Sequence, residues 1–210
     1  MIITIDGPAA SGKSSVAKLL AERLKIAFVS SGQLYRAVTY LVLESSTPFD
    51  EQEILAMLGG YELGLEPIPD LPNKITVNGR DISTELNTDE IDANVSKVAI
   101  FPKVREWVDE RLKAIRGSFV IEGRDMGAKV FKNADYKFYL TASPQLRAKR
   151  RLAERLKGFS ELVISIIERD KRDYRQLKPA EDAIFIDTEQ LNLDEVVEKL
   201  YQRISGGKDS

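Results

Sequence analysis

The sequence has 210 residues, of which 43% are hydrophobic and 30% are charged, and its net charge at pH 7 is −2. This composition is typical of a soluble globular protein, and the length suits one α/β domain with a small insert. The near-neutral charge argues against general affinity for nucleic acids or membranes. No apolar run reaches membrane-spanning length and no signal peptide is evident, so we expect a cytoplasmic protein.

The chain contains neither cysteine nor histidine. Without cysteine there are no disulfides, no thiol catalysis and no Cys–zinc sites, which is consistent with a reducing compartment. Without histidine there is no Ser–His–Asp catalysis, no imidazole base and no His–metal site. Phosphoryl transfer depends on positioning and charge neutralisation and needs none of these groups. The composition therefore favours an enzyme of that kind.

The first predicted element is a strand over residues 2–6, an apolar run typical of a buried parallel strand. It leads into GPAASGKSS, which contains the phosphate-loop pattern G-x-x-x-x-G-K-S, and then into a helix with Val16, Leu19, Leu20 and Leu24 on one face. Strand, loop and helix predict a site where backbone N–H groups and a helix N-terminus bind phosphates. The predicted ATP-binding residues are Gly7, Pro8, Ala9, Ala10, Ser11, Gly12, Lys13, Ser14 and Ser15.

Two of these residues have specific predicted roles. Lys13 is expected to reach the β- and γ-phosphates, and the Ser14 hydroxyl is expected to bind Mg²⁺. The alternative is an ordinary glycine-containing turn between a strand and a helix.

Further strands are predicted at residues 27–30, 119–122, 136–140 and 184–187. Helical periodicity predicts three later helices, whose apolar faces carry Val104, Trp107, Val108, Leu112 and Ile115; then Leu162, Val163, Ile166 and Ile167; and finally Val196, Val197, Leu200, Tyr201 and Ile204. This alternation predicts a parallel sheet covered by helices.

Residues 60–88 interrupt the alternation. They contain three prolines and strand-like pieces around an Asn78-Gly79 turn, which predict a small β-rich insert. The core would then comprise residues 1–59 and 89–210, and residues 205–210 are expected to form a frayed tail.

Charged and polar side chains follow several of the predicted strands. SSGQLYRA brings Ser31 and Arg36, EGRDMG brings Arg124 and Asp125, and ERDKRDYR carries Arg169 and Asp173 on one helical face. Ligands bind at the carboxyl ends of parallel strands, and separated arginines suit a second phosphate group. For each residue alone, a surface ion pair is an equally good explanation.

Other nucleotide-binding motifs are incomplete. NKIT at 73–76 is one residue from a guanine-specificity motif but lacks the aspartate that pairs with guanine. SSGQL resembles the signature of transporter ATPases but lies too close to the phosphate loop. Asp187, at the end of the strand 184–187, could be a metal-associated carboxylate or part of an ordinary polar turn.

Seven segments in order, IDGPAASGKSS, SSGQLYRA, SKVAIFPKVRE, EGRDMG, KFYLTASPQLRAKRR, ERDKRD and PAEDAIFIDTEQLNLDEVV, together resemble bacterial cytidylate kinases over nearly the whole chain. The resemblance implies a nucleoside-monophosphate-kinase fold of the P-loop class, α/β with a five-stranded parallel sheet. It also implies a CMP-binding insert at 60–88 and a short lid at 147–160. The implied reaction is ATP + (d)CMP → ADP + (d)CDP, with Mg²⁺ as cofactor, in a monomer.

The same resemblance assigns the CMP site. The cytosine-reading positions are Ser96, Arg105 and Asp125, the phosphate-binding positions are Arg36 and Arg124 with Ser31 nearby, and the ribose-binding positions are Arg169 and Asp173. An acceptor and a donor at the base can separate cytosine from uracil, whose hydrogen-bonding groups are reversed. The alternatives are a solvated charge for Arg105 and a helix-cap or packing role for Ser96.

Catalysis is assigned to charge-stabilising groups. The expected catalytic residues are Lys13, Arg124 and the lid arginines Arg147, Arg150 and Arg151, with Arg155 as a further candidate. The chain departs from the family pattern at Ser30, Glu122 and Ala128, and a third phosphate-binding arginine is either Arg175 or lost at Gln176. The alternative functions are a kinase for another nucleoside monophosphate such as UMP, or a P-loop NTPase switch.

Overall fold

The computed structural model describes residues 1–69, 73–152, 158–174 and 176–206 of the chain. The chain divides into two compact units, one formed by Met1–Phe28 and Ser118–Ser210 and the other by Val29–Gly117. The predictions for Arg155, for Arg175, for the lid segment 153–157 and for the tail at 207–210 lie outside the described residues.

The first unit is built on a five-stranded sheet with the order β2-β6-β1-β7-β8. The pairs β1–β6, β1–β7 and β7–β8 are all parallel. The strands are β1 (Ile2–Asp6), β2 (Ala27–Ser30), β6 (Phe119–Gly123), β7 (Tyr136–Thr141) and β8 (Ile184–Asp187). All five predicted strands are confirmed, and the predicted fold class with them.

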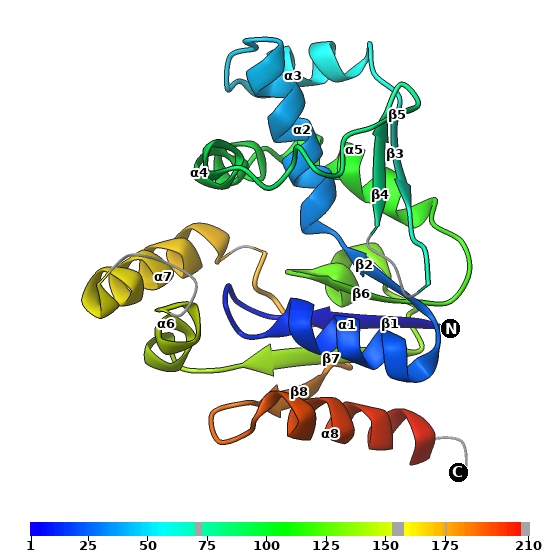
Figure 1. Cartoon of the computed structure of the whole chain (residues 1–210), viewed down its shortest axis with the longest axis vertical. Helices are drawn as coiled ribbons and strands as arrows, with labels where there is room; N and C mark the ends of the chain where they lie inside the picture. Colours follow the sequence, from blue (N-terminus) through cyan, green and yellow to red (C-terminus); the bar gives the residue numbers. More distant parts are fainter. Residues whose placement is uncertain (70–72, 153–157, 175, 207–210) are drawn as a thin grey trace. The chain divides into compact units, whose positions relative to one another are not determined.

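Helices α1 (Lys13–Leu24) and α8 (Leu193–Gly206) lie side by side along the sheet (Figure 1). Their apolar faces join the residues of β1, β6, β7 and β8 in one core cluster. The predicted apolar faces of α1 and α8 are confirmed at four buried residues, Val16, Leu20, Val197 and Leu200. Burial of this apolar surface is the main force that holds the unit together.

Two further helices, α6 (Pro144–Leu152) and α7 (Phe159–Asp173), pack against each other in the first unit. Leu162 and Ile166 of α7 are buried with Ala148 of α6, as the periodicity predicts for the α7 residues. The prediction for Ile167 is wrong, since its side chain is exposed. A short π-helix, η1 (Met126–Val130), follows β6 and was not predicted.

The second unit contains a three-stranded antiparallel sheet and four helices. Its elements are α2 (Gly32–Glu44), α3 (Glu51–Leu58), β3 (Leu63–Glu66), β4 (Lys74–Val77), β5 (Arg80–Asp81), α4 (Asp89–Val98) and α5 (Pro102–Lys113). The sheet lies within the predicted insert 60–88, and Asn78 and Gly79 both have positive φ, as the predicted turn requires. The compact unit is wider than the insert because α2 packs on α4 and α3 packs on α5.

The buried face of α5 is more polar than its apolar periodicity suggests. Val104, Val108 and Leu112 are buried as predicted, but Trp107 is only partly buried. Arg105 and Asp109 are buried instead, with 7% and 3% of their surfaces exposed. The alternative of a solvated charge for Arg105 is therefore wrong. None of the helices in the described part of the chain is both long enough and apolar enough to span a membrane.

Candidate active site

The phosphate loop joins β1 to α1 and requires unusual backbone conformations. Gly7, Ala10 and Gly12 have φ angles of 147°, 58° and 92°. At Gly7 an added Cβ would lie 2.3 Å from the carbonyl oxygen of Leu140. That oxygen belongs to the backbone and cannot move away without distorting the chain. Gly12 is the N-cap of α1 and begins the helix in the left-handed region that glycine favours. The two glycines of the motif therefore allow the turn and its close approach to β7.

Lys13 is the first residue of α1, and 7% of its surface is exposed. Its ammonium group donates a hydrogen bond to the carbonyl oxygen of Pro8 at 2.7 Å, so the side chain lies over its own loop. The pKa of Lys13 is lowered to about 7, chiefly by burial and also by the nearby charges of Arg124 and Arg169, against the opposing effect of Glu122 and Asp6. The positive charges around Lys13 disfavour its charged form when no anion is present, and they favour the binding of an anion.

Asp6, the last residue of β1, was missed by the sequence analysis. Its carboxylate accepts hydrogen bonds from the backbone N–H groups of Met126 at 2.9 Å and Gly127 at 2.7 Å. Burial raises the pKa of Asp6 to about 6, although those two hydrogen bonds oppose the shift. Asp6 thereby ties the start of η1 to the strand that leads into the phosphate loop.

The segment that Asp6 holds carries two of the predicted CMP-binding residues. Asp125 is buried and immediately precedes η1. Arg124 donates to the carbonyl oxygen of Gly7 at 3.2 Å and forms an ion pair with Asp173 at 2.9 Å. Arg169 lies one turn before Asp173 on α7, with 3.8 Å between its Nε and the Asp173 carboxylate. The pKa of Arg169 is lowered to about 10, chiefly by burial and also by the charge of Arg124.

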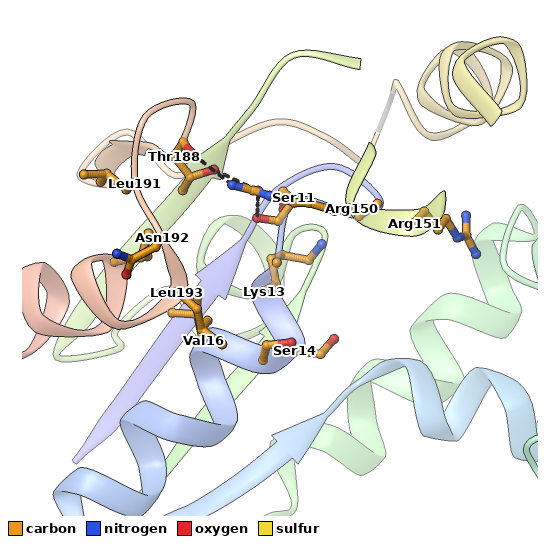
Figure 2. Close-up of a pocket in the computed structure, with 14 residues that line it drawn as sticks. Ser11, Lys13, Ser14, Val16, Arg150, Arg151, Thr188, Leu191, Asn192 and Leu193 are labelled. Carbon is orange, nitrogen blue, oxygen red and sulfur yellow. Dashed lines mark hydrogen bonds between the residues drawn. The ribbon is translucent and has the colours of Figure 1, made fainter. Parts of the chain in front are cut away.

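A pocket of about 440 Å³ opens beside the loop (Figure 2). One wall is the loop and the start of α1, and another comes from the segment that joins β8 to α8. That second wall was not predicted, and its lining residues are Thr188, Leu191, Asn192, Leu193 and Val196. The sequence did contain a signal for the start of α8 within this wall, because Asn192 and Glu195 form a reciprocal helix cap.

Two of the predicted lid arginines line this pocket. Arg150 donates to the carbonyl oxygen of Ser11 at 3.2 Å, to the hydroxyl of Thr188 at 3.1 Å and to the carbonyl oxygen of Thr188 at 2.9 Å. It thus bridges the loop and the opposite wall, as Figure 2 shows. In the same view the side chain of Arg151 extends away from the loop.

Arg147 differs from these two, because it is almost completely buried and 3% of its side chain is exposed. It forms a two-point ion pair with Asp170 of α7 at 3.0 and 2.6 Å. It also donates to the carbonyl oxygens of Ala9 in the loop and Ala142 after β7, at 3.1 and 3.0 Å. Arg147 therefore links three segments of the first unit.

The remaining predicted CMP residues belong to the second unit. Ser31 is buried and directly precedes α2, which carries Arg36, and Ser96 lies on α4, which packs on α2. The guanidinium of Arg105 on α5 lies 5.3 Å from the ring centroid of Tyr35 on α2 and donates to the carbonyl oxygen of Ala99 at 3.4 Å. These residues thus lie on three helices of one unit.

Among the described residues, no three acidic side chains come together in a way that could hold a metal ion. Ser14 is exposed at the start of α1, next to Lys13, as expected of a hydroxyl that binds Mg²⁺ together with bound phosphates. Asp187 is exposed, and its carboxylate accepts from the backbone N–H of Glu189, which agrees with a polar turn after β8.

A parallel sheet with a glycine-rich loop and a buried lysine between its first strand and helix defines a P-loop nucleotide-binding protein. Solved structures with a similar fold include shikimate kinase from Acinetobacter baumannii in complex with shikimate, with a TM-score of 0.50 and 14% identity over 100% of this chain and 95% of the other. Shikimate kinase from Bacteroides thetaiotaomicron has a TM-score of 0.52 and 11% identity, covering 98% of both chains.

Sequence comparison is more specific. The family model for cytidylate kinase matches residues 3–206. The cytidylate kinase of Thermus thermophilus is 48% identical over 198 residues, covering 93% of this chain and 94% of its own. That of Deinococcus radiodurans is 47% identical over 205 residues, covering 97% and 99%. That of Bacillus licheniformis is 38% identical over 214 residues, covering 96% and 95%. The chain belongs to the cytidylate kinase family.

The buried carboxylate of Asp6 predicts a specific dependence of stability on pH. The pKa of Asp6 is about 6 in the folded chain and 3.8 in the reference state, so the folded state binds more protons between these values. The free energy of unfolding contributed by Asp6 therefore falls as pH rises from about 4 to 6, by roughly 3 kcal/mol. In urea titrations across this range, Asp6→Asn should gain stability relative to wild type.

The control is Asp194→Asn, which removes an exposed carboxylate in the first turn of α8. Its stability should follow that of wild type across the same range. A constant difference between Asp6→Asn and wild type would contradict the assignment.

The ion pair between Arg147 and Asp170 predicts that a substitution of Asp170 lowers the stability of the protein. Asp170→Asn leaves the buried guanidinium without its carboxylate, and we expect a loss of about 2–3 kcal/mol in the free energy of unfolding, discounted because Asp170 is partly exposed. Glu168→Gln removes an exposed charge from the same helix and should change stability by less than about 0.5 kcal/mol. Equal effects of the two substitutions would show that the ion pair contributes little.

Proposed function

We propose that this chain transfers the γ-phosphoryl group of ATP to CMP or dCMP, giving ADP and CDP or dCDP. The observation that carries the proposal is the position of Arg124, which donates to the carbonyl oxygen of Gly7 in the phosphate loop. The arginine assigned to the acceptor phosphate is thus in contact with the loop assigned to the donor. Lys13, Arg124 and Arg169 place three cationic groups near one another, which suits two phosphate groups better than one.

ATP would bind in the pocket beside the loop. Backbone N–H groups of residues 7–15 and the N-terminus of α1 would hold its phosphates, and Lys13 would move from Pro8 to the β- and γ-phosphates. The apolar wall that contains Leu191, Leu193 and Val196 would contact the adenine. Ser14 would bind Mg²⁺, which neutralises phosphate charge and takes oxygen ligands from bound phosphates and water.

CMP would bind the residues that the family resemblance assigns. In the first unit, Asp125 would accept from the cytosine amine, Arg124 would bind the phosphate, and Asp173 with Arg169 would meet the ribose. In the second unit, Ser96 and Arg105 would read the base, and Arg36 with Ser31 would bind the phosphate. The burial of Asp125 and Arg105 supports base reading, because a base with the wrong donors and acceptors would leave these buried groups without hydrogen bonds.

The chemistry needs no general base. The nucleophile is an oxygen of the CMP phosphate, which is already anionic because its second pKa is near 6. The protein would align the two phosphates and stabilise the charge on the transferred group with Lys13, Arg124, Arg150 and Arg151. Arg147, whose donors are committed to Ala9, Ala142 and Asp170, would instead position the loop against α7.

We also infer that residues 60–88 act as the CMP-binding insert and residues 147–160 as a short lid that excludes water from the reaction. A cytoplasmic location and a monomeric state stay predictions of the sequence.

The first test is formation of ADP from Mg·ATP with CMP, dCMP, UMP, AMP or GMP as acceptor, and with no acceptor. We expect turnover with CMP and dCMP and very little with the others. Lys13→Ala should lower turnover at least about 10²-fold with every acceptor, because it removes charge stabilisation of the transferred group. Lys18→Ala, which removes an exposed lysine from the same helix, should have no effect.

Each outcome has a definite meaning. Equal turnover with UMP would show that the base-reading residues do not discriminate and would favour a kinase for several pyrimidine nucleotides. ADP formation without an acceptor would favour an NTPase switch. Full activity in Lys13→Ala would contradict the assignment of the phosphate loop.

The second test concerns base selection by Asp125. Asp125→Asn replaces an acceptor with a side chain that can also donate, so it should lower the preference for CMP over UMP in kcat/KM by about 30-fold or more. Its affinity for Mg·ATP should match that of wild type, because the substitution lies outside the phosphate loop. An unchanged ratio of CMP to UMP would remove Asp125 from the base-reading set.

A further inference from the structure

We propose that Asp92 competes with the acceptor's phosphate for Arg36 and so sets the affinity for the acceptor nucleotide: its carboxylate occupies Arg36 in the free protein and is displaced by that phosphate. The inference rests on the proposed function, in which Arg36 binds that phosphate. It adds a residue that neither the motifs nor the family resemblance single out.

The contact is formed entirely within the second unit. Arg36 lies on α2 and Asp92 on α4, two helices that pack side by side (Figure 1). One terminal nitrogen of Arg36 donates to the Asp92 carboxylate, and the other donates to the carbonyl oxygen of Leu86 at 3.0 Å. Two of the five N–H donors of this guanidinium, one on each terminal nitrogen, are therefore used by one charged and one neutral acceptor.

The local sequence fixes where Asp92 lies. Thr88 caps the N-terminus of α4 by accepting from the N–H of Ile91 at 3.2 Å, and the N–H of Asp92 donates to the carbonyl oxygen of Thr88 at 3.0 Å. Ile91 is buried and anchors this first turn. Asp92 follows it directly, so a capped and anchored turn presents its carboxylate to Arg36.

Carboxylate and phosphate compete for the same guanidinium. Both accept two parallel hydrogen bonds from an arginine fork, but the phosphate of a nucleoside monophosphate carries nearly two negative charges at neutral pH. Two anions on the same guanidinium edge repel each other, so the phosphate and Asp92 cannot share it. The carbonyl of Leu86 is neutral and can remain in place. Binding of the acceptor therefore exchanges one anion for a stronger one.

The exposure of the pair makes this exchange feasible. The side chains of Arg36 and Asp92 are each 27% exposed, so the displaced carboxylate can reach water. A fully buried pair would have to leave a charge without solvent, which is far more costly. The exchange lowers the affinity for the acceptor nucleotide, because its phosphate must displace Asp92, whereas a ligand without a phosphate leaves the pair intact.

The test compares Asp92→Asn with Asp89→Asn. Both remove one negative charge from the first two turns of α4, and Asp89 is exposed. We expect Asp92→Asn to lower the KM for CMP about three- to tenfold, the range expected for a partly exposed ion pair, and Asp89→Asn to leave it unchanged. The inhibition constant of cytidine, which has no phosphate, should be the same in both variants and in wild type.

Arg36→Gln separates this proposal from the function on which it rests. If Arg36 binds the acceptor phosphate, Arg36→Gln raises the KM for CMP, and adding Asp92→Asn to it has no further effect. If Arg36→Gln leaves the KM unchanged, the assigned role of Arg36 fails and the inference fails with it.

Three results would overturn the inference while the role of Arg36 stands. The KM for CMP could stay the same or rise in Asp92→Asn, and a rise would mean that Asp92 holds Arg36 ready for substrate. Asp92→Asn could strengthen CMP and cytidine binding equally, so that the effect would not act through the phosphate. Asp92→Asn could also lower KM to the same extent when Arg36 is Gln.

Discussion

The active centre of the first unit depends on the contact between the Asp6 carboxylate and the backbone N–H groups of Met126 and Gly127. Asp6 ends the strand that leads into the phosphate loop, and residues 126–127 follow Arg124 and Asp125 directly. One side chain thus sets the distance between the loop assigned to ATP and two residues assigned to CMP. Phosphoryl transfer requires the two phosphates in line, so contacts that fix the spacing of these two segments, such as this one and that of Arg124 with Gly7, matter for the proposed reaction. A buried carboxylate is costly, and the two N–H donors offset part of that cost.

The strands of the sheet could be predicted from the sequence because the features that define each strand lie within the strand itself. The strands β1 and β6 at the centre of the sheet are almost continuously buried, and burial on both faces requires short, largely apolar runs of this kind. The phosphate loop was predictable for the same reason, since its glycines are required by the backbone conformation of only a few neighbouring residues. The faces of α1 and α8 were predictable because each helix covers the sheet with one apolar stripe.

The predictions were poorest where buried polar side chains have partners far away in the sequence. Periodicity favoured Trp107 for the core of α5, but Arg105 and Asp109 are buried there. The contacts of Arg147 with Ala9, Ala142 and Asp170 were not predicted. Asp6 was placed correctly at the end of a strand, but its buried contacts with Met126 and Gly127 were not predicted. A charged residue is buried when a partner meets it in three dimensions, and a single sequence does not reveal that partner.

Three arginine–aspartate pairs show how burial separates structural charges from functional ones. Arg147 with Asp170 holds segments of the first unit together: 3% of the Arg147 side chain is exposed, and it also donates to two backbone carbonyl oxygens. Arg124 with Asp173 and Arg36 with Asp92 are more open, with side chains 19% to 27% exposed. An enzyme that binds phosphates must carry several arginines near one another, and without anions these cations repel. Partly exposed aspartates neutralise them in the free protein and can give way to a phosphate, whereas an arginine that is itself almost completely buried, like Arg147, is part of the scaffold.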